Sequence, residues 1–221
     1  MENEFFFPPY KGELYGKPEG FFNEVRVMAI GNSHHCDTKF DHYHRCCEQC
    51  ENYIPSCNNF TTDVVNDYIS NPTGEGCEEG DDRWRRTFTK FANLLGANGS
   101  IERVWNSIVF YNFLQCAVPN SKAQGNTVEV NRSKEYMLTL LTEYAPDVVI
   151  VWRNTHVYQC LPKGENWKDI TDRTGIYTIN GKNIRVACIK HPMICGYEYG
   201  RDIIKSIAPE LYKKLLLSAK L

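Results

Sequence analysis

The sequence predicts an α/β protein, a three-layer α/β/α domain with a mostly parallel, four-stranded, doubly wound sheet. Four short runs rich in β-branched residues have the length of strands, and segments with helical spacing separate them. Most of the runs lack a clean alternation of apolar and polar residues, which is typical of strands that helices cover on both faces. Strands that alternate with helices predict a parallel sheet with right-handed crossovers.

Each of the four predicted strands ends at a sharp change in composition. The runs are 25–30, 107–111, 147–152 and 184–189, and they are followed by Gly31, Asn112, Arg153 and Lys190. Before the fourth run, the segment 176–184 has Asn180-Gly181 at its centre, which is the turn chemistry of a hairpin.

Helical patterns fill the segments between these strands. They run from Thr61 or Thr62 to Ile69, over 83–95, over 133–144, and over 201–220 with a break or kink near Pro209. Thr61 or Thr62 is the expected cap of the first helix. No repeat or low-complexity tract divides the chain, so we expect a single domain over 1–221.

Composition and charge limit the classes of function. The chain has 221 residues, of which 42% are apolar and 24% charged, as in an ordinary globular protein. Its formal net charge is -2, whereas proteins that neutralise many phosphates carry a strong basic excess. Tight non-specific DNA binding is therefore not expected, and any affinity for nucleic acid has to come from a local patch.

We expect a cytoplasmic protein without a membrane partner. No run approaches the ~20 apolar residues that span a bilayer. The run Phe5-Phe6-Phe7 follows acids and precedes prolines, so we do not interpret it as a signal peptide. In a reducing compartment, the ten cysteines are expected to be thiols or metal ligands rather than disulfides.

Polar side chains follow the predicted strands at the edge where ligands bind in open parallel sheets. They lie in Gly31-Asn32-Ser33-His34-His35, at Asn112, in Arg153-Asn154 and in His191-Pro192. An amide with a hydroxyl, a second amide and an imidazole can together hold a flat heterocycle by its edge. The alternative interpretation is that each of these side chains satisfies backbone groups at its own strand end.

These motifs resemble those of the uracil-DNA glycosylase superfamily. Its members have a first motif of the type G-Q-D-P-Y or G-E-A-P-G after the first strand, an Asn after the second, and H-P-S after the last. Gly31 to His35, Phe110-Tyr111-Asn112 and His191-Pro192 follow in the same order, over about 25–204 of this chain. The segments 83–91, 105–115 and 146–152 look most like a poorly characterised group whose first motif is G-E-S-H-Y.

The resemblance implies a role for each matching residue. The family flips a nucleotide out of the duplex and cleaves the bond between its base and its sugar. Asn112 falls where the family's Asn reads the pyrimidine edge, His191 where its His donates a hydrogen bond to the departing base, and Asn32 in the motif that holds the attacking water. We therefore predict Asn32 and His191 as catalytic residues, and Gly31, Ser33, His34, Tyr111, Asn112 and Pro192 as substrate-binding residues. Phe40, Tyr43 and Tyr111 are alternative aromatic partners for the base.

The chain also departs from the family pattern. The strongest members have a carboxylate in the first motif, where this chain has Asn32-Ser33. An amide can orient a water molecule but cannot take its proton, so general-base catalysis of ~10²–10⁴-fold would be missing. Met193-Ile194-Cys195 stands where the family has Ser and then a DNA-penetrating loop.

A Cys/His-rich insertion occupies about 36–58. It contains Cys36, Cys46, Cys47, Cys50 and Cys57, with His42 and His44 between them. Cys47-x-x-Cys50 has the spacing of a tetrahedral metal site, which Cys36 and Cys57 can complete, so we predict a structural zinc. The alternatives are free thiols in a loop, or an iron–sulfur cluster, for which the superfamily spreads its cysteines more widely. No cofactor is expected to be required for catalysis.

Arg83, Arg86 and Lys90 share one face of a predicted helix, which can approach a phosphate backbone. Acidic residues at 78–82 largely offset this charge, and a solvated helix is the alternative.

The leading functional hypothesis is a DNA glycosylase that hydrolyses the N-glycosidic bond of a damaged or modified base. The alternative is a non-catalytic module that keeps the pocket and binds a nucleobase, a nucleotide or DNA. A third hypothesis makes the cysteine-rich insertion a partner-docking or metal-sensing element.

Overall fold

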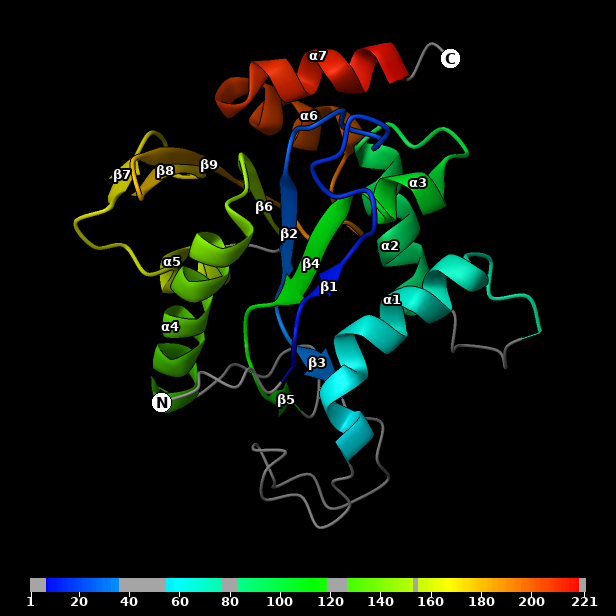
Figure 1. The fold of residues 1–221 in the computed structure, drawn as a ribbon, viewed down its shortest axis with the longest axis horizontal. Coiled ribbons are helices and arrows are strands. Elements are labelled where there is room, and N and C mark those ends of the chain that lie inside the picture. The colour runs from blue at the N-terminus through cyan, green and yellow to red at the C-terminus, as the bar shows by residue number, and fades with distance from the viewer. Residues whose placement is uncertain (1–6, 36–54, 77–82, 119–126, 153–154, 219–221) are drawn as a thin grey trace.

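The computed structural model describes residues 7–35, 55–76, 83–118, 127–152 and 155–218 (Figure 1). Seven strands form one mixed sheet in the order β1-β4-β2-β6-β9-β8-β7. The four strands in the middle are parallel: β4 (Ile108–Asn112), β2 (Val27–Gly31), β6 (Val148–Trp152) and β9 (Lys182–Ile189). Antiparallel strands extend both edges: β1 (Tyr10–Lys11), β8 (Thr174–Ile179) and β7 (Trp167–Asp169).

The predicted α/β class is confirmed, but the sheet is larger and more mixed than the four strands predicted from the sequence. The four predicted runs are the parallel strands in the middle. β8 is the first arm of the predicted hairpin, and Asn180 and Gly181 form its two-residue turn with φ of 50° and 75°. β1 and β7 have two and three residues, too few to give a periodic pattern.

A second, small parallel sheet continues the path of β2 and β4 beyond their ends. β3 (His34–His35) pairs with β5 (Ala117–Val118). Between the two sheets, the Phe113 amide donates to the Gly31 carbonyl at 3.0 Å and the Leu114 amide donates to the Asn32 carbonyl at 2.9 Å. The two chain segments therefore stay paired from residue 27 to residue 35.

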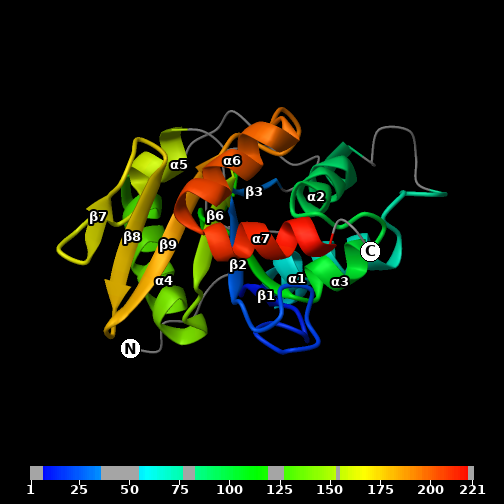
Figure 2. The same ribbon diagram turned by 90° about the horizontal axis from the view of Figure 1, so that it is seen from above.

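Helices cover both faces of the main sheet and give it three layers (Figures 1 and 2). One face packs against α1 (Phe60–Ser70), α2 (Arg83–Leu94), α3 (Ile101–Trp105), α6 (Tyr197–Ile207) and α7 (Pro209–Ser218). The other face packs against α4 (Thr127–Tyr144) and α5 (Thr155–Cys160). Every residue of β2 and of β6 is buried, as expected of strands between two helical layers.

The helices differ from the predicted ones mainly at their ends. α4 begins at Thr127, six residues before the expected start at Ser133. The break expected near Pro209 is confirmed: two helices replace a single one, and Pro209 is the first residue of the second, where its missing N–H costs no hydrogen bond. The predicted cap at Thr61 or Thr62 is wrong, because both residues lie inside α1 and Asn59 precedes it.

The connection order creates a switch point in the parallel sheet. The chain leaves β2, adds β4 on one side of it, and then returns to add β6 on its other side. Ligands of open α/β sheets bind at such a reversal, beyond the carboxyl ends of the strands. The ends of β2 and β6, at Gly31 and Trp152, therefore mark the position where a ligand site is expected.

Within the described parts of the chain, none of the helices has the length and apolar character needed to cross a bilayer.

Arg85 ties α2 to the end of α1. Its side chain is 5% exposed and donates to the Asp67 carboxylate at 2.6 Å and to the Asn71 carbonyl at 2.7 Å. Neighbouring Arg86 is exposed, as expected of a solvated helix face. The basic segment of α2 thus contains one structural arginine that the charge pattern alone does not distinguish from its neighbour.

We expect Arg85→Ala to lower the free energy of unfolding by about 2–4 kcal/mol, because the change removes charge-assisted hydrogen bonds and opens a cavity. Arg86→Ala, one residue further along the same helix, is the matched control and should stay within about 1 kcal/mol of wild type. Urea unfolding of both variants measures the difference, and equal losses would contradict the role of Arg85.

Candidate functional site

The polar side chains predicted from the sequence lie at the carboxyl edge of the parallel strands. Asn32 and Ser33 directly follow β2, Asn112 is the last residue of β4, and His191 lies two residues after the end of β9. All four side chains are half-buried. Residues 153–154, which follow β6, lie outside the described residues.

Gly31 and Asn112 approach each other more closely than two residues with side chains could. They are register partners in β2 and β4, and a Cβ atom added to Gly31 would lie 2.0 Å from Oδ1 of Asn112. The same Cβ would lie 3.3 Å from the ring of Phe110. The absence of a side chain at residue 31 is therefore what allows the Asn112 amide to lie across the end of β2.

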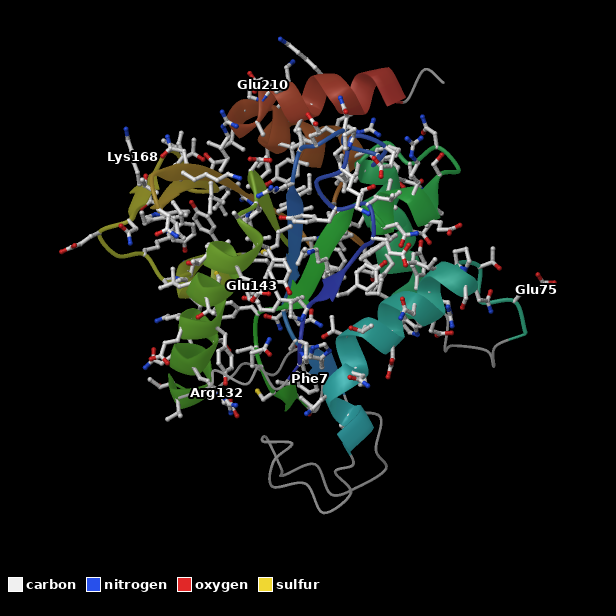
Figure 3. All side chains as sticks on the ribbon, in the orientation of Figure 1. Phe7, Glu75, Arg132, Glu143, Lys168 and Glu210 are labelled. Atoms are coloured by element: carbon white, nitrogen blue, oxygen red, sulfur yellow. The ribbon has the colours of Figure 1, made fainter. Side chains whose placement is uncertain are left out.

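His34 contacts the other end of the Asn112 amide. Nδ2 of Asn112 lies 3.2 Å from Nδ1 and 3.4 Å from Nε2 of His34, and Oγ1 of Thr61 lies 3.2 Å from Nε2. The imidazole is 4% exposed and packs against the rings of Phe7 and Phe60, with centroids 4.3 and 5.0 Å away. Figure 3 shows Phe7 beside β3 and the beginning of α1. His34, predicted as a substrate-binding residue, thus lies behind Asn112 in a largely buried position.

Gln115 also hydrogen-bonds to the end of β4, and the sequence does not predict this role. Its Nε2 donates to the Asn112 carbonyl at 2.8 Å, and its Oε1 accepts the Phe7 amide at 3.2 Å. The side chain is 5% exposed. The only sequence signal is its position three residues after Asn112, which does not reveal that it returns to the end of β4.

Asn32 and Ser33 form a pair at the end of β2. Nδ2 of Asn32 donates to Oγ of Ser33 at 2.9 Å, and the Asn32 carbonyl accepts the Leu114 amide. With Nδ2 directed at the serine, Oδ1 of Asn32 is the acceptor that this side chain offers to a ligand or a water molecule.

His191 begins a compact turn after β9. Its carbonyl accepts the amides of Ile194 and Cys195, and Nζ of Lys90 donates to the Met193 carbonyl at 3.0 Å. The Met193 amide donates to Nδ1 of His191 at 3.3 Å. Because Nδ1 is then an acceptor, the neutral imidazole carries its proton on Nε2.

Within this turn Pro192 is buried, whereas Ile194 is 73% exposed. The turn thus combines one buried and one exposed apolar side chain.

Two buried aromatic rings connect the strand ends on this face. The rings of Phe110 and Trp152 lie 5.0 Å apart, and the ring of Trp152 lies 6.5 Å from that of His191. Both aromatic side chains are 3% exposed and belong to the core. Trp152 thus links the His191 imidazole to the core, a role that the apolar runs of the sequence do not distinguish from ordinary core packing.

Tyr111 is not brought together with these residues. Side chains alternate along β4, so Tyr111 points to the face opposite Asn112 and is fully buried with Met137 and Tyr177. Burial and the neighbouring Tyr177 raise the pKa of its phenol above the ordinary value. Phe40 and Tyr43, the other predicted stacking partners, lie outside the described residues.

Three of the four predicted zinc ligands, Cys36, Cys47 and Cys50, also lie outside the described residues. Cys57 is half-buried in a 3-10 helix over Pro55–Asn59, just before α1. In the described ranges, no three His, Cys, Asp or Glu side chains come close enough to hold a metal ion. The structural zinc stays a prediction from the sequence.

Cys116, Cys188 and Cys195 are buried, and Cys160 is half-buried. Burial is the largest cause that raises the pKa of the Cys188 thiol, to about 12, so this thiol stays protonated at neutral pH.

Neither the protein-family models nor the curated proteins include a match to this chain. The resemblance to the uracil-DNA glycosylase superfamily therefore depends on the ordered motifs and stays a prediction.

We expect Gly31→Ala to lower the free energy of unfolding by about 1–3 kcal/mol, because the new methyl group has to displace the Asn112 amide. Gly164→Ala is the matched control, since a Cβ there meets no atom within 4 Å. Urea unfolding compares the two, and equal stability would contradict the close approach of Gly31 and Asn112.

We expect Tyr111→Phe to leave stability unchanged or raise it by up to about 1 kcal/mol. The Tyr111 hydroxyl is buried and has no hydrogen-bond partner among the described residues. Tyr68→Phe should cost about 1 kcal/mol instead, because its hydroxyl lies 2.8 Å from Oγ1 of Thr89. Thermal unfolding separates the two, and a clear loss in Tyr111→Phe would show that its hydroxyl has a partner.

Proposed function

We propose that the protein is an N-glycosidic hydrolase that releases a damaged or modified base from DNA. The observation that carries this proposal is the set of polar groups around the switch point, namely Asn32, Asn112 and His191 at the ends of three parallel strands. Their order along the chain agrees with the motif order of the uracil-DNA glycosylase superfamily.

The spacing of the strands supports a flat ligand. β4 and β9 are separated by β2 and β6, so three strand spacings, about 14 Å, lie between them. Asn112 ends the first of these strands and His191 lies two residues after the second, so a single heterocycle that contacts both has to lie across the ends of β2 and β6. Asn32 lies between them, at the end of β2.

His191 is suited to stabilise the departing base. When the N-glycosidic bond breaks, its electron pair stays on the base, and negative charge develops on the base's carbonyl oxygen. An Nε2–H group held by the Met193 contact can donate to that oxygen. A preorganised donor of this kind contributes about 3–4 kcal/mol to transition-state stabilisation.

Asn32 and Ser33 orient the attacking water but do not deprotonate it. Oδ1 of Asn32 can accept a hydrogen bond from the water molecule, while Nδ2 is held by Ser33. The water's proton then passes to solvent as its oxygen bonds to the sugar carbon. We therefore expect a slow enzyme whose rate depends mainly on stabilisation of the leaving base.

The turn after His191 supports DNA as the carrier of the base. Ile194 is 73% exposed at its surface, and Lys190 and Lys90 flank the turn. Proteins that extrude a base or bend DNA insert apolar side chains between base steps, and nearby lysines neutralise phosphates.

A second candidate function is binding without catalysis. None of the described residues that directly follow β2, β4 and β9 is an Asp or Glu. A site without a general base favours recognition of a nucleobase or nucleotide over its hydrolysis.

The test uses end-labelled single- and double-stranded oligonucleotides that carry uracil or another damaged base. We expect alkali-labile cleavage at the lesion, reduced about 10²–10³-fold in His191→Ala through loss of the Nε2–H donor. Asn112→Ala should lose activity as well. Asn106→Ala is the matched control at the amino end of β4, where the side chain accepts a hydrogen bond from Tyr10.

Undiminished cleavage in His191→Ala would exclude the role assigned to this residue. If folded wild-type protein cleaves none of the substrates, thermal unfolding with added bases and nucleotides decides between the candidates. A ligand at 100 times its Kd stabilises its protein by ~2.7 kcal/mol, so a shift of that size without cleavage would establish the binding module.

A further inference from the structure

Two cationic side chains lie against the ring of Tyr199 at the carboxyl edge of the sheet. Nζ of Lys190 lies 4.9 Å from the centre of this ring, and the guanidinium carbon of Arg173 lies 5.6 Å from it. Lys190 directly follows β9, Arg173 directly precedes β8, and Tyr199 is in the first turn of α6. Three different segments thus bring two positive charges to one ring.

The pairing of β8 with β9 places this group at the same edge as the candidate site. Arg173 lies level with the end of β9, because its carbonyl accepts the Cys188 amide at 2.8 Å. On the other side of β9, Trp152 at the end of β6 pairs with Ile189. Arg173 therefore lies one strand spacing, about 4.8 Å, beyond β9, on the side away from Asn112.

Both cations keep hydrogen-bond donors for a ligand. Among the described residues, neither Nζ of Lys190 nor the guanidinium group of Arg173 donates a hydrogen bond. Arg173 has one ion pair, from Nε to Asp172 at 3.6 Å, and in the same parts of the chain Lys190 has none. An ammonium group has three N–H donors and a guanidinium group has five, so most of them can bind an anion.

The positive charge of this group is only partly offset. The Asp172 side chain is 84% exposed, so water screens its pair with Arg173. Glu198 and Asp202 flank Tyr199 in α6, but both are exposed, and within the described ranges neither pairs with the two cations. The ring attracts each cation through its negative face and leaves their mutual repulsion in place. An anion bound by both cations would relieve that repulsion.

We propose that Lys190 and Arg173, held on the Tyr199 ring, form a binding site for a nucleotide phosphate. This inference rests on the proposed function and adds a phosphate contact beside His191. Arg173 can offer two parallel N–H donors to phosphate oxygens, and Lys190 adds a point charge. Neither cation nor the ring belongs to the motifs that resemble the superfamily, so the resemblance does not supply this site. A DNA strand and a free nucleotide both carry the phosphate group, and experiment distinguishes the two sources.

The salt dependence of DNA binding tests the site without any cleavage. The probe is a fluorescein-labelled duplex without a lesion, whose Kd is measured by fluorescence anisotropy between about 50 and 200 mM salt. The slope of log K against log salt changes by about 0.9 for each contact to a duplex phosphate. We expect Lys190→Gln and Arg173→Gln each to flatten the slope by about one, and to weaken binding about five- to tenfold at the lower salt.

Lys205→Gln is the matched control. Lys205 is also an exposed lysine over a tyrosine ring, with Nζ 5.2 Å from the centre of the Tyr212 ring, but it lies further along α6 than Tyr199. Its substitution changes the net charge by the same amount and should leave the slope as in wild type. Lys190→Arg keeps the charge and should also retain the slope.

The ring has its own pair of variants. Tyr199 packs against the core, and its hydroxyl has no hydrogen-bond partner among the described residues. Tyr199→Phe keeps the ring and should bind DNA as wild type does. Tyr199→Leu removes the surface that holds both cations and should flatten the slope. Urea unfolding checks that Tyr199→Leu is folded.

Thermal unfolding with deoxyuridine monophosphate and with deoxyuridine distinguishes a free nucleotide from DNA. If the phosphate belongs to a free nucleotide, the monophosphate should stabilise wild type more than the nucleoside does. That difference should vanish in Lys190→Gln and Arg173→Gln, while their slopes for DNA stay unchanged. This outcome would support the phosphate site and assign it to a free nucleotide.

The proposal is overturned if Lys190→Gln and Arg173→Gln change neither the slope for DNA nor the preference for the monophosphate. It is also overturned if Lys205→Gln has the same effect as these two variants. Cleavage is a separate readout. A wild type that binds DNA but cleaves none of the damaged substrates would exclude the proposed hydrolysis and not the phosphate site, whereas cleavage with unchanged binding in both variants would exclude the phosphate site alone.

Discussion

The site depends on the parallel pairing of β2 with β4 and on the missing side chain at Gly31. Parallel strands bring their carboxyl ends to the same edge, and the register sets Gly31 opposite Asn112. Without a Cβ at residue 31, the asparagine amide can lie across the end of the neighbouring strand. The pairing continues to β3 and β5, so the next residues of both strands also meet and bring His34 to the far side of the same amide.

Because successive side chains of β4 point to opposite faces of the sheet, its residues contribute to different layers. Phe110 and Asn112 point to the face that carries α1 and α2, and Tyr111 points to the face that carries α4. Phe110 continues through Trp152 to His191 as a row of packed rings. Core side chains therefore connect the strands from which the two polar ends of the site extend, which is the support that a preorganised binding site needs.

The sequence predicts the middle of the fold well and its edges poorly. The four apolar runs are long enough to show strand character, and the polar residues after them follow from the geometry of parallel sheets. β1, β3, β5 and β7 are too short to produce a pattern. Their existence depends on hydrogen bonds to partners far along the chain, as when Tyr10 pairs with Phe110.

The same limit applies to the site. Asn112 and His191 could be identified because each lies within two residues of the end of a strand. Thr61 and Gln115 could not be identified from the sequence. Their side chains reach the site from a helix and from a loop, and only tertiary packing determines where these two segments lie. Tyr111 was assigned to the site from its neighbour in the sequence, although adjacent residues of a strand face opposite layers. Arg85 is a further case, since a buried arginine and an exposed one look alike in a basic segment.

The lack of a carboxylate changes where catalytic power can come from. General-base help from the first motif is worth ~10²–10⁴-fold, and a preorganised donor to the leaving group is worth a similar amount. In the proposed hydrolysis, a site with Asn32 in place of an acid would rely on His191, and the usefulness of that donor would depend on how firmly it is held before the reaction. The turn is held by two amide-to-carbonyl bonds, by the Met193 amide on Nδ1 and by Lys90 from α2. These contacts fix the tautomer and the position of the imidazole together. A histidine so constrained would cost little reorganisation when charge develops on a base, which is the condition that the proposed hydrolysis without a general base requires.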